Sequence, residues 1–176
     1  AINIAAMTFM VPLGISVAIT SRIGHAIGAG EYALARYLGF SGIALCGLVM
    51  LVPAAVYLLL PEWIVMIYTS DPEVHEVAVV LLFMAAIFQL SDGLQVGALG
   101  ALRGLKDTRI PLLTNIFSYL MIGLPGAYIL GIYFDIGPEG LWTGIIVGLS
   151  IAALLHNLRF HLLTKTQKIE PEPLSF

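Results

Sequence analysis

The sequence predicts an all-α polytopic membrane protein with five transmembrane helices. Of its 176 residues, 59% are apolar and only 11% are charged, whereas ordinary soluble domains carry roughly 25% charged residues. The mean hydropathy is +0.97. The apolar residues also fall into stretches of about 20 residues or more, the length that crosses the ~30 Å hydrocarbon core of a bilayer.

The five apolar stretches divide the chain into a membrane bundle and a short tail. The stretches cover about residues 2–21, 35–60, 77–102, 110–133 and 141–163. Together they define a transmembrane bundle over residues 1–165, and residues 166–176 form a polar tail with two prolines that we expect to be disordered. Because a hydrophobic stretch begins at once after Ala1, we interpret the chain as a fragment of a longer protein.

The basic residues are segregated along the chain. The second connection (61–76) and the fourth (134–140) contain acidic residues and no Lys or Arg. Every basic residue lies in or beside the first connection (24–36), the third (103–109) or the tail: Arg22, Arg36, Arg103, Lys106, Arg109, Arg159, Lys165 and Lys168. Because cytoplasmic loops carry an excess of Lys and Arg, we expect the first and third loops and the C-terminal tail to be cytoplasmic.

Three spans contain proline in their interior: the second holds Pro53, and the first and fourth hold the two prolines that we interpret as hinges. Pro12 lies in the first span, and Pro125 follows Gly123 in the fourth, where we expect a break or kink over residues 123–126. Proline removes a backbone donor, which is tolerable in a membrane only where protein or water satisfies the freed carbonyl. Pro12 and Pro125 are therefore predicted hinges, with a static kink as the alternative.

The third span carries Asp92, the one acid placed in the middle of an apolar stretch. Gln89, Asp92 and Gln95 fall within an arc of about 120° on a helix, and Phe88 shares that arc. Asp92 precedes Arg103 by about 16 Å of helix, which places the carboxylate near the middle of the bilayer. Such a residue is costly to bury and usually marks an ion or proton pathway. The alternative is an Asp that only hydrogen-bonds a neighbouring helix.

Other residues of the chain argue for packing and against several functional classes. Gly93, Gly97, Gly100 and Gly104 group on a face beside that of Asp92, so another helix can approach it closely. Cys46 is the only cysteine, which excludes a disulfide framework. The pair His156 and His161 lacks acidic or Cys partners and is expected to snorkel or to lie at the membrane interface. We predict no enzyme, because no clustered nucleophile or base is visible, and no nucleic-acid binding.

The segment FMAAIFQLSDGLQVGALGALRGLKDTRIP resembles the tenth transmembrane helix and following loop of the multidrug and toxic compound extrusion (MATE) family, in particular its NorM branch. VPLGISVAITSRIGHAIGAG is similar to the eighth helix, and GLPGAYIL and GPEGLWTGIIVG to the eleventh and twelfth. The resemblance implies that the five spans are helices eight to twelve, or most of the C-terminal lobe, of a twelve-helix transporter.

The resemblance further implies an antiporter in the bacterial inner membrane that exports cationic, amphipathic drugs in exchange for Na+ or H+. Its partners would be the N-terminal lobe of the same protein, the lipid bilayer and the drugs, and it would need no cofactor beyond the coupling ion. Asp92 would bind the cation, Na+ in a sodium-coupled protein. Phe88 stands one turn earlier, where some relatives carry tyrosine, and Gln89 and Gln95 would line the same site.

The coupling ion stays open, because Phe88 offers no hydroxyl ligand and the acid that the family carries on helix seven lies outside this chain. The alternative functions are a lipid-linked oligosaccharide flippase of the same superfamily and a non-transporting membrane subunit. A flippase would need a charged cavity for a pyrophosphate. The middle of these spans holds one acid and no base.

Overall fold

The computed structural model describes residues 2–68 and 72–166, and within them it is a bundle of long helices without strands. The predicted tail lies almost entirely outside the described residues. The elements are α1 (Ile2–Gly28), α2 (Tyr32–Leu59), α3 (Pro61–Tyr68), α4 (Pro72–Gly104), α5 (Arg109–Ile116), η1 (Phe117–Gly123), α6 (Leu124–Tyr128), η2 (Ile129–Tyr133) and α7 (Pro138–Thr166).

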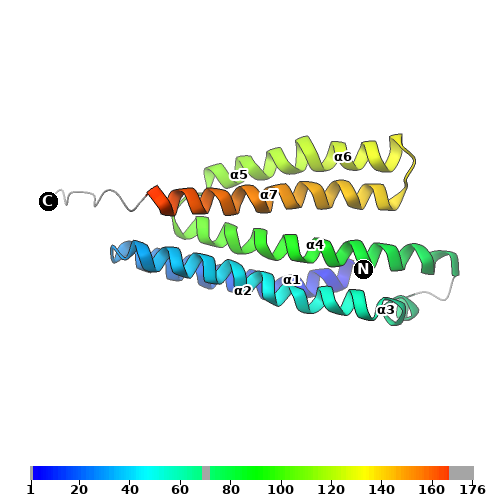
Figure 1. Ribbon diagram of the computed structural model, residues 1–176, viewed down its shortest axis with the longest axis horizontal. Coiled ribbons are helices and arrows are strands. Elements are labelled where there is room, and N and C mark those ends of the chain that lie inside the picture. Colours follow the sequence, from blue (N-terminus) through cyan, green and yellow to red (C-terminus); the bar gives the residue numbers. More distant parts are fainter. Residues whose placement is uncertain (1, 69–71, 167–176) are drawn as a thin grey trace.

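Five segments of the described chain are long and apolar enough to span a membrane, as the sequence predicts. Helix α4 is the centre of the bundle: it packs against α1 and α2 on one side and against α7 on the other. The continuous run from α5 to η2 packs on α7 (Figure 1). The spans alternate in direction, because each is joined to the next by a short connection.

The first connection is a tight turn and not a long loop. Helix α1 continues to Gly28 and α2 begins at Tyr32. The Glu31 N–H donates to the Ala26 carbonyl at 2.8 Å, and the Gly30 N–H donates to the Ile27 carbonyl at 3.0 Å. Gly30 has a φ of 75°, the left-handed conformation that this type of helix C-cap requires. The turn therefore reverses the chain within three residues, Ala29 to Glu31.

The second connection is also partly helical. Helix α3 occupies Pro61–Tyr68, inside the segment expected to be a loop. Val65 of α3 is buried and belongs to a cluster with Tyr57 and Leu82, whereas Trp63 is 71% exposed. The short helix forms because one of its faces finds apolar partners on α2 and α4.

The fourth span does not break at Gly123–Gly126 as expected. It stays helical from Arg109 to Tyr133, but it widens into π-helix in η1 and η2, on both sides of α6. The Leu124 N–H donates to the Tyr119 carbonyl, five residues back. The Pro125 nitrogen cannot donate to the carbonyl four residues earlier. π-Helical turns occur as local bulges within α-helices. The predicted break is therefore wrong, because the span stays helical. The helix is nevertheless distorted on both sides of the predicted position.

The glycine face predicted on α4 is confirmed as a packing face. A Cβ atom on Gly100 would lie 2.4 Å from the Ser16 Oγ and 2.6 Å from the Ser16 carbonyl oxygen of α1. Two hydrogen bonds join the same surfaces: the Ser16 hydroxyl donates to the Val96 carbonyl and the Thr20 hydroxyl to the Gly100 carbonyl, both at 2.9 Å. Small residues thus let the backbones of α1 and α4 touch.

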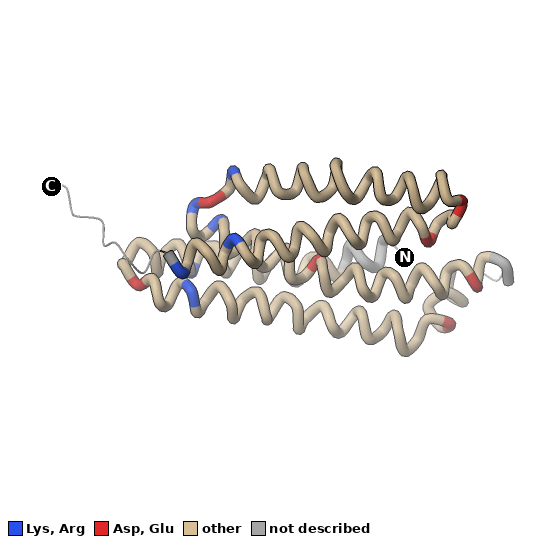
Figure 2. The backbone as a smooth tube through the Cα atoms, turned by 45° about the horizontal axis from the view of Figure 1, so that its top comes forward, with Lys and Arg blue, Asp and Glu red and all other residues tan. Residues whose placement is uncertain are grey.

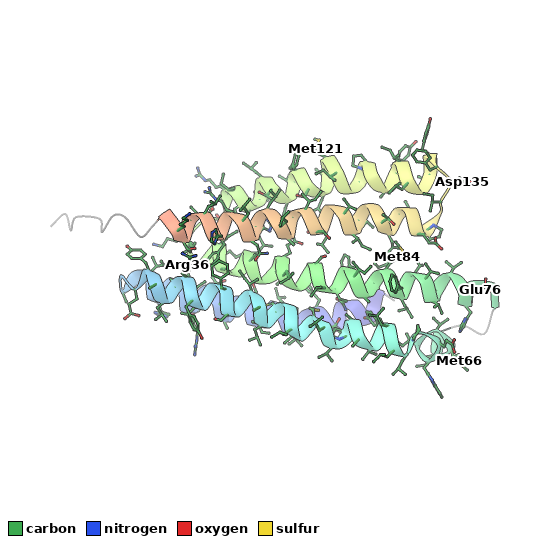
Figure 3. All side chains as sticks on the ribbon, viewed as in Figure 1. Arg36, Met66, Glu76, Met84, Met121 and Asp135 are labelled. Carbon is green, nitrogen blue, oxygen red and sulfur yellow. The ribbon has the colours of Figure 1, made fainter. Side chains whose placement is uncertain are left out.

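Charged residues separate to the two ends of the bundle, with Asp92 as the exception in between. Figure 2 shows Lys and Arg gathered at the end where the C-terminal trace leaves the bundle. In Figure 3, Arg36 lies at that end, and Glu76 and Asp135 lie at the opposite end. At the basic end Arg159 forms an ion pair with Asp107 at 3.0 Å. The up-and-down arrangement of the spans thus converts the segregation seen along the sequence into a segregation in space.

Candidate functional site

Asp92 lies in the middle of α4 on a face that no other helix of the described chain covers completely. The residue is half-buried. One flank of α4 contacts α1 through Gln89 and Val96, and the other contacts α5 and η1 through Gln95. Because a helix turns by 100° per residue, Asp92 falls between these flanks. Asp92 therefore lies on the partly exposed side of α4 between its contacts with α1 and with the fourth span, and we call this side the gap.

Among the side chains that the structure describes, in residues 8–67 and 74–165, none forms a hydrogen bond or ion pair with the Asp92 carboxylate. The sequence left open an Asp used only as a hydrogen-bonded link between helices, and this structure shows no such link for Asp92. In contrast, the neighbouring polar side chains of α4 all have partners.

Gln89 is turned toward α1 and α2. Its side chain is only 1% exposed, and its Nε2 donates to the Thr8 Oγ1 at 2.8 Å and to the Tyr57 Oη at 3.5 Å. Both partners belong to other helices, so the amide links three helices in the interior of the bundle. Gln89 thus faces away from the gap, although it shares an arc with Asp92 on the helix.

Gln95 is turned to the opposite side and binds the fourth span. Its Nε2 donates to the Asn115 Oδ1 at 3.0 Å, and the Tyr119 hydroxyl donates to the Gln95 Oε1 at 2.8 Å. Gln95 is 3% exposed. Gln95, Asn115 and Tyr119 therefore form one wall of the gap beside the carboxylate.

Phe88 lies one turn before Asp92 and packs on α7. Its ring meets the ring of Trp142 edge to face, with 5.9 Å between centroids and an interplanar angle of 79°. This is the preferred geometry for aromatic pairs. One turn of helix further on, Ser91 and Ser150 share a hydrogen bond of 2.9 Å between their hydroxyl oxygens. Phe88 is half-buried, so part of its side chain remains accessible.

The two predicted hinge prolines lie in different surroundings. Pro12 is fully buried inside α1, where the Cys46 thiol of α2 donates to its carbonyl at a sulfur–oxygen distance of 3.8 Å. Pro125 lies in α6 between the two π-helical segments. Their role as hinges stays a prediction, because a single conformation shows no movement.

Sequence reasoning did not assign Asn115 and Tyr119 to the site. Their spacing of one helical turn on the fourth span was a usable signal, since it places both polar groups on one helix face. Asn115 also lines a cavity of about 320 Å³ whose wall includes Arg103, Arg109 and Leu99. The cavity runs from the basic end of the bundle toward the Gln95 wall.

The expectation for His156 was wrong. Its side chain is 1% exposed, so it neither snorkels nor lies at the membrane surface. The Nε2 atom lies 3.3 Å from the Pro111 carbonyl, the geometry of an N–H donating to that oxygen. His156 thus joins α7 to the start of the fourth span. Among the described residues, no group of three or more His, Cys, Asp or Glu side chains could hold a metal ion.

The arrangement offers one negative charge in a largely apolar gap, with amides, a phenol hydroxyl and an aromatic ring close by. An isolated carboxylate in a medium of low dielectric constant attracts cations strongly. Aromatic rings bind cations and apolar groups. The chemistry that fits this set is reversible binding of a cation, without a covalent step.

Known proteins match this chain over most of its length. The family model described as MatE matches residues 1–129. Among curated relatives, a probable multidrug resistance protein NorM of Xanthomonas campestris pv. campestris is 45% identical over 160 residues, which cover 91% of this chain and 35% of that protein. The multidrug resistance protein PmpM of Pseudomonas aeruginosa is 43% identical over 163 residues, covering 90% of this chain and 34% of that protein.

Solved structures share the fold. An inward-facing multidrug resistance MATE family transporter of the MOP superfamily superposes with a TM-score of 0.86 at 21% identity. The match covers 97% of this chain and 39% of that chain. The eukaryotic MATE transporter AtDTX14 gives a TM-score of 0.79 at 22% identity, covering 93% of this chain and 38% of that one.

The fold, the five spans and the extent of these matches agree with one another. The chain spans about a third of the length of the curated relatives it matches, 35% of the Xanthomonas campestris protein. We conclude that this chain belongs to the MatE family of multi-pass membrane proteins.

Proposed function

We propose that this chain is most of the C-terminal lobe, helices eight to twelve, of a multidrug antiporter that exports cationic amphipathic compounds in exchange for Na+ or H+. The relatives named NorM and PmpM are described as multidrug resistance proteins, which supports the substrate class. The N-terminal lobe of the same transporter is its partner, and the central cavity lies between the two lobes.

The observation that carries the proposal is the state of Asp92. A carboxylate near the middle of a membrane helix is costly, and the three nearby polar side chains of α4 (Gln89, Ser91 and Gln95) are all hydrogen-bonded to other helices. Asp92 alone among these four keeps its oxygens free of such bonds within the described chain. A carboxylate that is costly to bury and has no neighbouring hydrogen-bond donor can bind a mobile cation.

The mechanism follows from competition for one charge. A single carboxylate in apolar surroundings balances one cation well and two poorly, because the two cations repel each other at short range. Asp92 alternates between the coupling ion and a cationic drug, and binding of one promotes release of the other. In a sodium-coupled protein Asp92 is a ligand of Na+. In a proton-coupled protein it carries the proton.

The surrounding residues have distinct roles in this proposal. Phe88 and the other aromatic side chains that face the gap contact the apolar part of the drug and its charge. Gln95 holds the Asn115 and Tyr119 wall in place and offers polar contacts to the ligand. Gln89 contributes by keeping α1 and α2 in register with α4. Pro12 and Pro125 are the points at which the helices bend as the gap opens to alternate sides.

The proposed topology places the basic end of the bundle in the cytoplasm, by the positive-inside rule. The first and third connections and the C-terminal tail then face the cytoplasm. The membrane is the bacterial inner membrane, as expected for a relative of bacterial multidrug resistance proteins.

A lipid-linked oligosaccharide flippase is less compatible with this site. Such a protein must bind a pyrophosphate inside the membrane, where Arg or Lys would be the natural ligand. In the described part of the chain, the Lys and Arg positions gather toward one end of the bundle (Figure 2). A non-transporting subunit would lose nothing when Asp92 is neutralised, so the experiment below separates it from an antiporter.

The test is drug efflux by the full-length protein reconstituted in liposomes, driven in turn by an imposed Na+ gradient and an imposed pH gradient. The wild type should transport a cationic dye with one of the two gradients, which identifies the coupling ion. Asp92→Asn should reduce gradient-driven efflux to the level of empty liposomes while the protein is recovered in normal amount.

Asp107→Asn is the matched control, because Asp107 lies in the third connection and pairs with Arg159. It should retain most of the transport activity. Gradient-driven efflux by Asp92→Asn at the wild-type rate would refute the assignment of the cation site.

A further inference from the structure

A groove on the outside of the bundle lies between α1 and α2, away from Asp92. It has a volume of about 530 Å³, within the range of sites that hold small molecules. Ten residues line it: Ile15, Ala18, Ile19, Arg22, Leu38, Ser41, Gly42, Ala44, Leu45 and Leu48. The lining is almost wholly apolar, and the small side chains of Ala18 and Ala44 leave space at two exposed positions.

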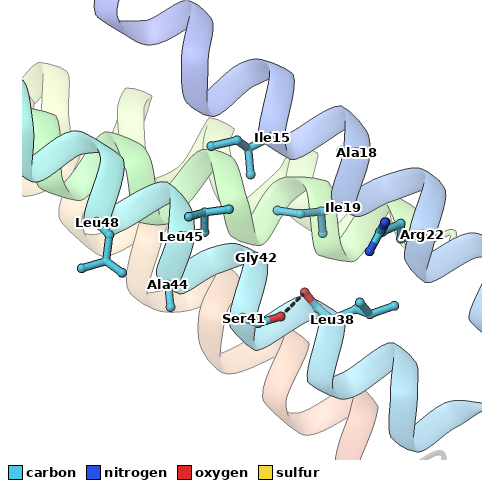
Figure 4. A pocket seen from close by; sticks show the side chains of 10 residues that line it. All are labelled: Ile15, Ala18, Ile19, Arg22, Leu38, Ser41, Gly42, Ala44, Leu45 and Leu48. Carbon is cyan, nitrogen blue, oxygen red and sulfur yellow. Dashed lines mark hydrogen bonds between the residues drawn. The ribbon is translucent and has the colours of Figure 1, made fainter.

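One end of the groove carries a positive charge. Figure 4 shows Arg22 at one end and Leu48 at the other. Arg22 is exposed and forms no ion pair with any side chain that the structure describes. The other polar group, the Ser41 hydroxyl, donates to the Tyr37 carbonyl of its own helix at 2.8 Å. The groove therefore combines an apolar floor with a single unpaired cation.

The dimensions match one leaflet of a bilayer. Leu38 and Leu48 lie ten residues apart on α2, which is about 15 Å along a helix. The hydrocarbon core of a bilayer is about 30 Å thick, so one leaflet contributes about 15 Å. Arg22 lies within two turns of the end of α1, and Figure 2 shows Lys and Arg gathered at one end of the bundle.

We propose that this groove binds an anionic phospholipid, with one acyl chain between α1 and α2 and the phosphate group at Arg22. The charge complementarity selects the occupant. A cationic drug would be repelled by Arg22, and a zwitterionic lipid would gain less from it, because its headgroup carries a cation of its own. The acyl chain would lie over the point at which α1 and α2 meet closely, where a Cβ atom on Gly42 would overlap the Ile19 side chain.

The test is native mass spectrometry of the full-length protein, incubated in detergent with equal amounts of dioleoyl phosphatidylglycerol and dioleoyl phosphatidylcholine. The wild type should retain phosphatidylglycerol in preference. Arg22→Gln should weaken this retention about fivefold, as expected for one Arg at an anionic headgroup. Glycerophosphoglycerol, which has the headgroup but no acyl chains, should not displace the lipid.

A second variant tests the apolar part of the groove. Ala18→Leu combined with Ala44→Leu fills the space with side chains from two exposed positions, so the contact between α1 and α2 is preserved. It should reduce retention of both lipids, with thermal unfolding close to that of the wild type.

Arg36→Gln is the control for charge, because Arg36 lies at the same end of the helix pair but its guanidinium carbon is 5.7 Å from the centre of the Phe40 ring. It should leave the lipid preference unchanged. Equal retention of the two lipids by the wild type would overturn the proposal. Retention of phosphatidylglycerol at the wild-type level by both Arg22→Gln and the double leucine variant would also overturn it. The groove would then hold another occupant, such as a further helix of the protein.

Discussion

Helix α4 has two faces that differ in almost every physical property. On the packing face, defined by Gly93, Gly97, Gly100 and Gly104, the backbone touches α1 and α2, and a Cβ atom at any of the four positions would meet a neighbour within 3.0 Å. On the open face, defined by Phe88, Asp92, Leu99 and Arg103, the side chains are partly or fully exposed, and Leu99 and Arg103 line a cavity. The two faces lie on one continuous helix.

The contrast shows how one helix can separate stability from function. The packing face tolerates no added volume, so its sequence is set by close contact with α1 and α2. The open face carries a charge that contributes nothing to the contacts within the described bundle. Changes on the packing face should therefore impair folding, and a change at Asp92 should impair transport first.

The largest expected effect is on the packing face. Gly100→Leu would force a side chain into the Ser16 backbone, whose carbonyl oxygen lies 2.6 Å from the position of a Cβ atom. Overpacking a core typically costs about 1–3 kcal/mol, and a clash with backbone leaves little room for relief. We expect the full-length variant to be recovered in much lower amount and to elute as aggregate in size-exclusion chromatography.

Gly14→Leu is the matched control for this substitution. A Cβ atom on Gly14 would meet nothing within 4 Å in the described structure, and Gly14 is exposed on α1. This variant should be recovered like the wild type. If both leucine variants behave alike, close contact is not what distinguishes the packing face.

A smaller effect is expected where the two faces meet. Gln95→Leu removes the hydrogen bonds to Asn115 and Tyr119. Hydrogen bonds between membrane helices average about 0.6 kcal/mol each and reach about 1.7, so the variant should lose about 1–2 kcal/mol. Thermal unfolding of the full-length protein measures the loss.

Ser41→Ala is the control for that loss, because the Ser41 hydroxyl bonds only to carbonyls of its own helix. It should unfold at nearly the wild-type temperature. A Gln95→Leu variant as stable as Ser41→Ala would show that the Gln95 wall does not hold the fourth span.

The comparison also shows what could be predicted from the sequence. The five spans were predictable because their lengths and apolar content depend only on local composition, and because the thickness of a bilayer sets the length that a span needs. The packing face was predictable because glycines spaced by about one turn fall on one side of a helix. The position of Asp92 between two flanks followed from the same periodicity.

What could not be predicted depends on contacts between distant segments. Gln89 and Thr8 are separated by 81 positions, so the direction of the Gln89 amide could not be read from its helix alone. The π-helical segments around Pro125 depend in part on α7, whose Gly144 leaves no room for a Cβ atom against the Ala127 backbone. The burial of His156 likewise depends on Pro111, which lies 45 positions away.

The most direct test of the cation site measures the reactivity of Asp92 itself. Dicyclohexylcarbodiimide, an apolar reagent that modifies carboxyl groups inside membranes, is added to the full-length protein, and the peptide that contains Asp92 is followed by mass spectrometry. We expect Asp92 to be modified, and we expect saturating tetraphenylphosphonium, an apolar cation, to slow the modification by about tenfold or more, because the reagent reacts with the protonated carboxyl group and the bound cation keeps it ionised. Modification of Asp92 at the same rate with and without the cation would contradict it.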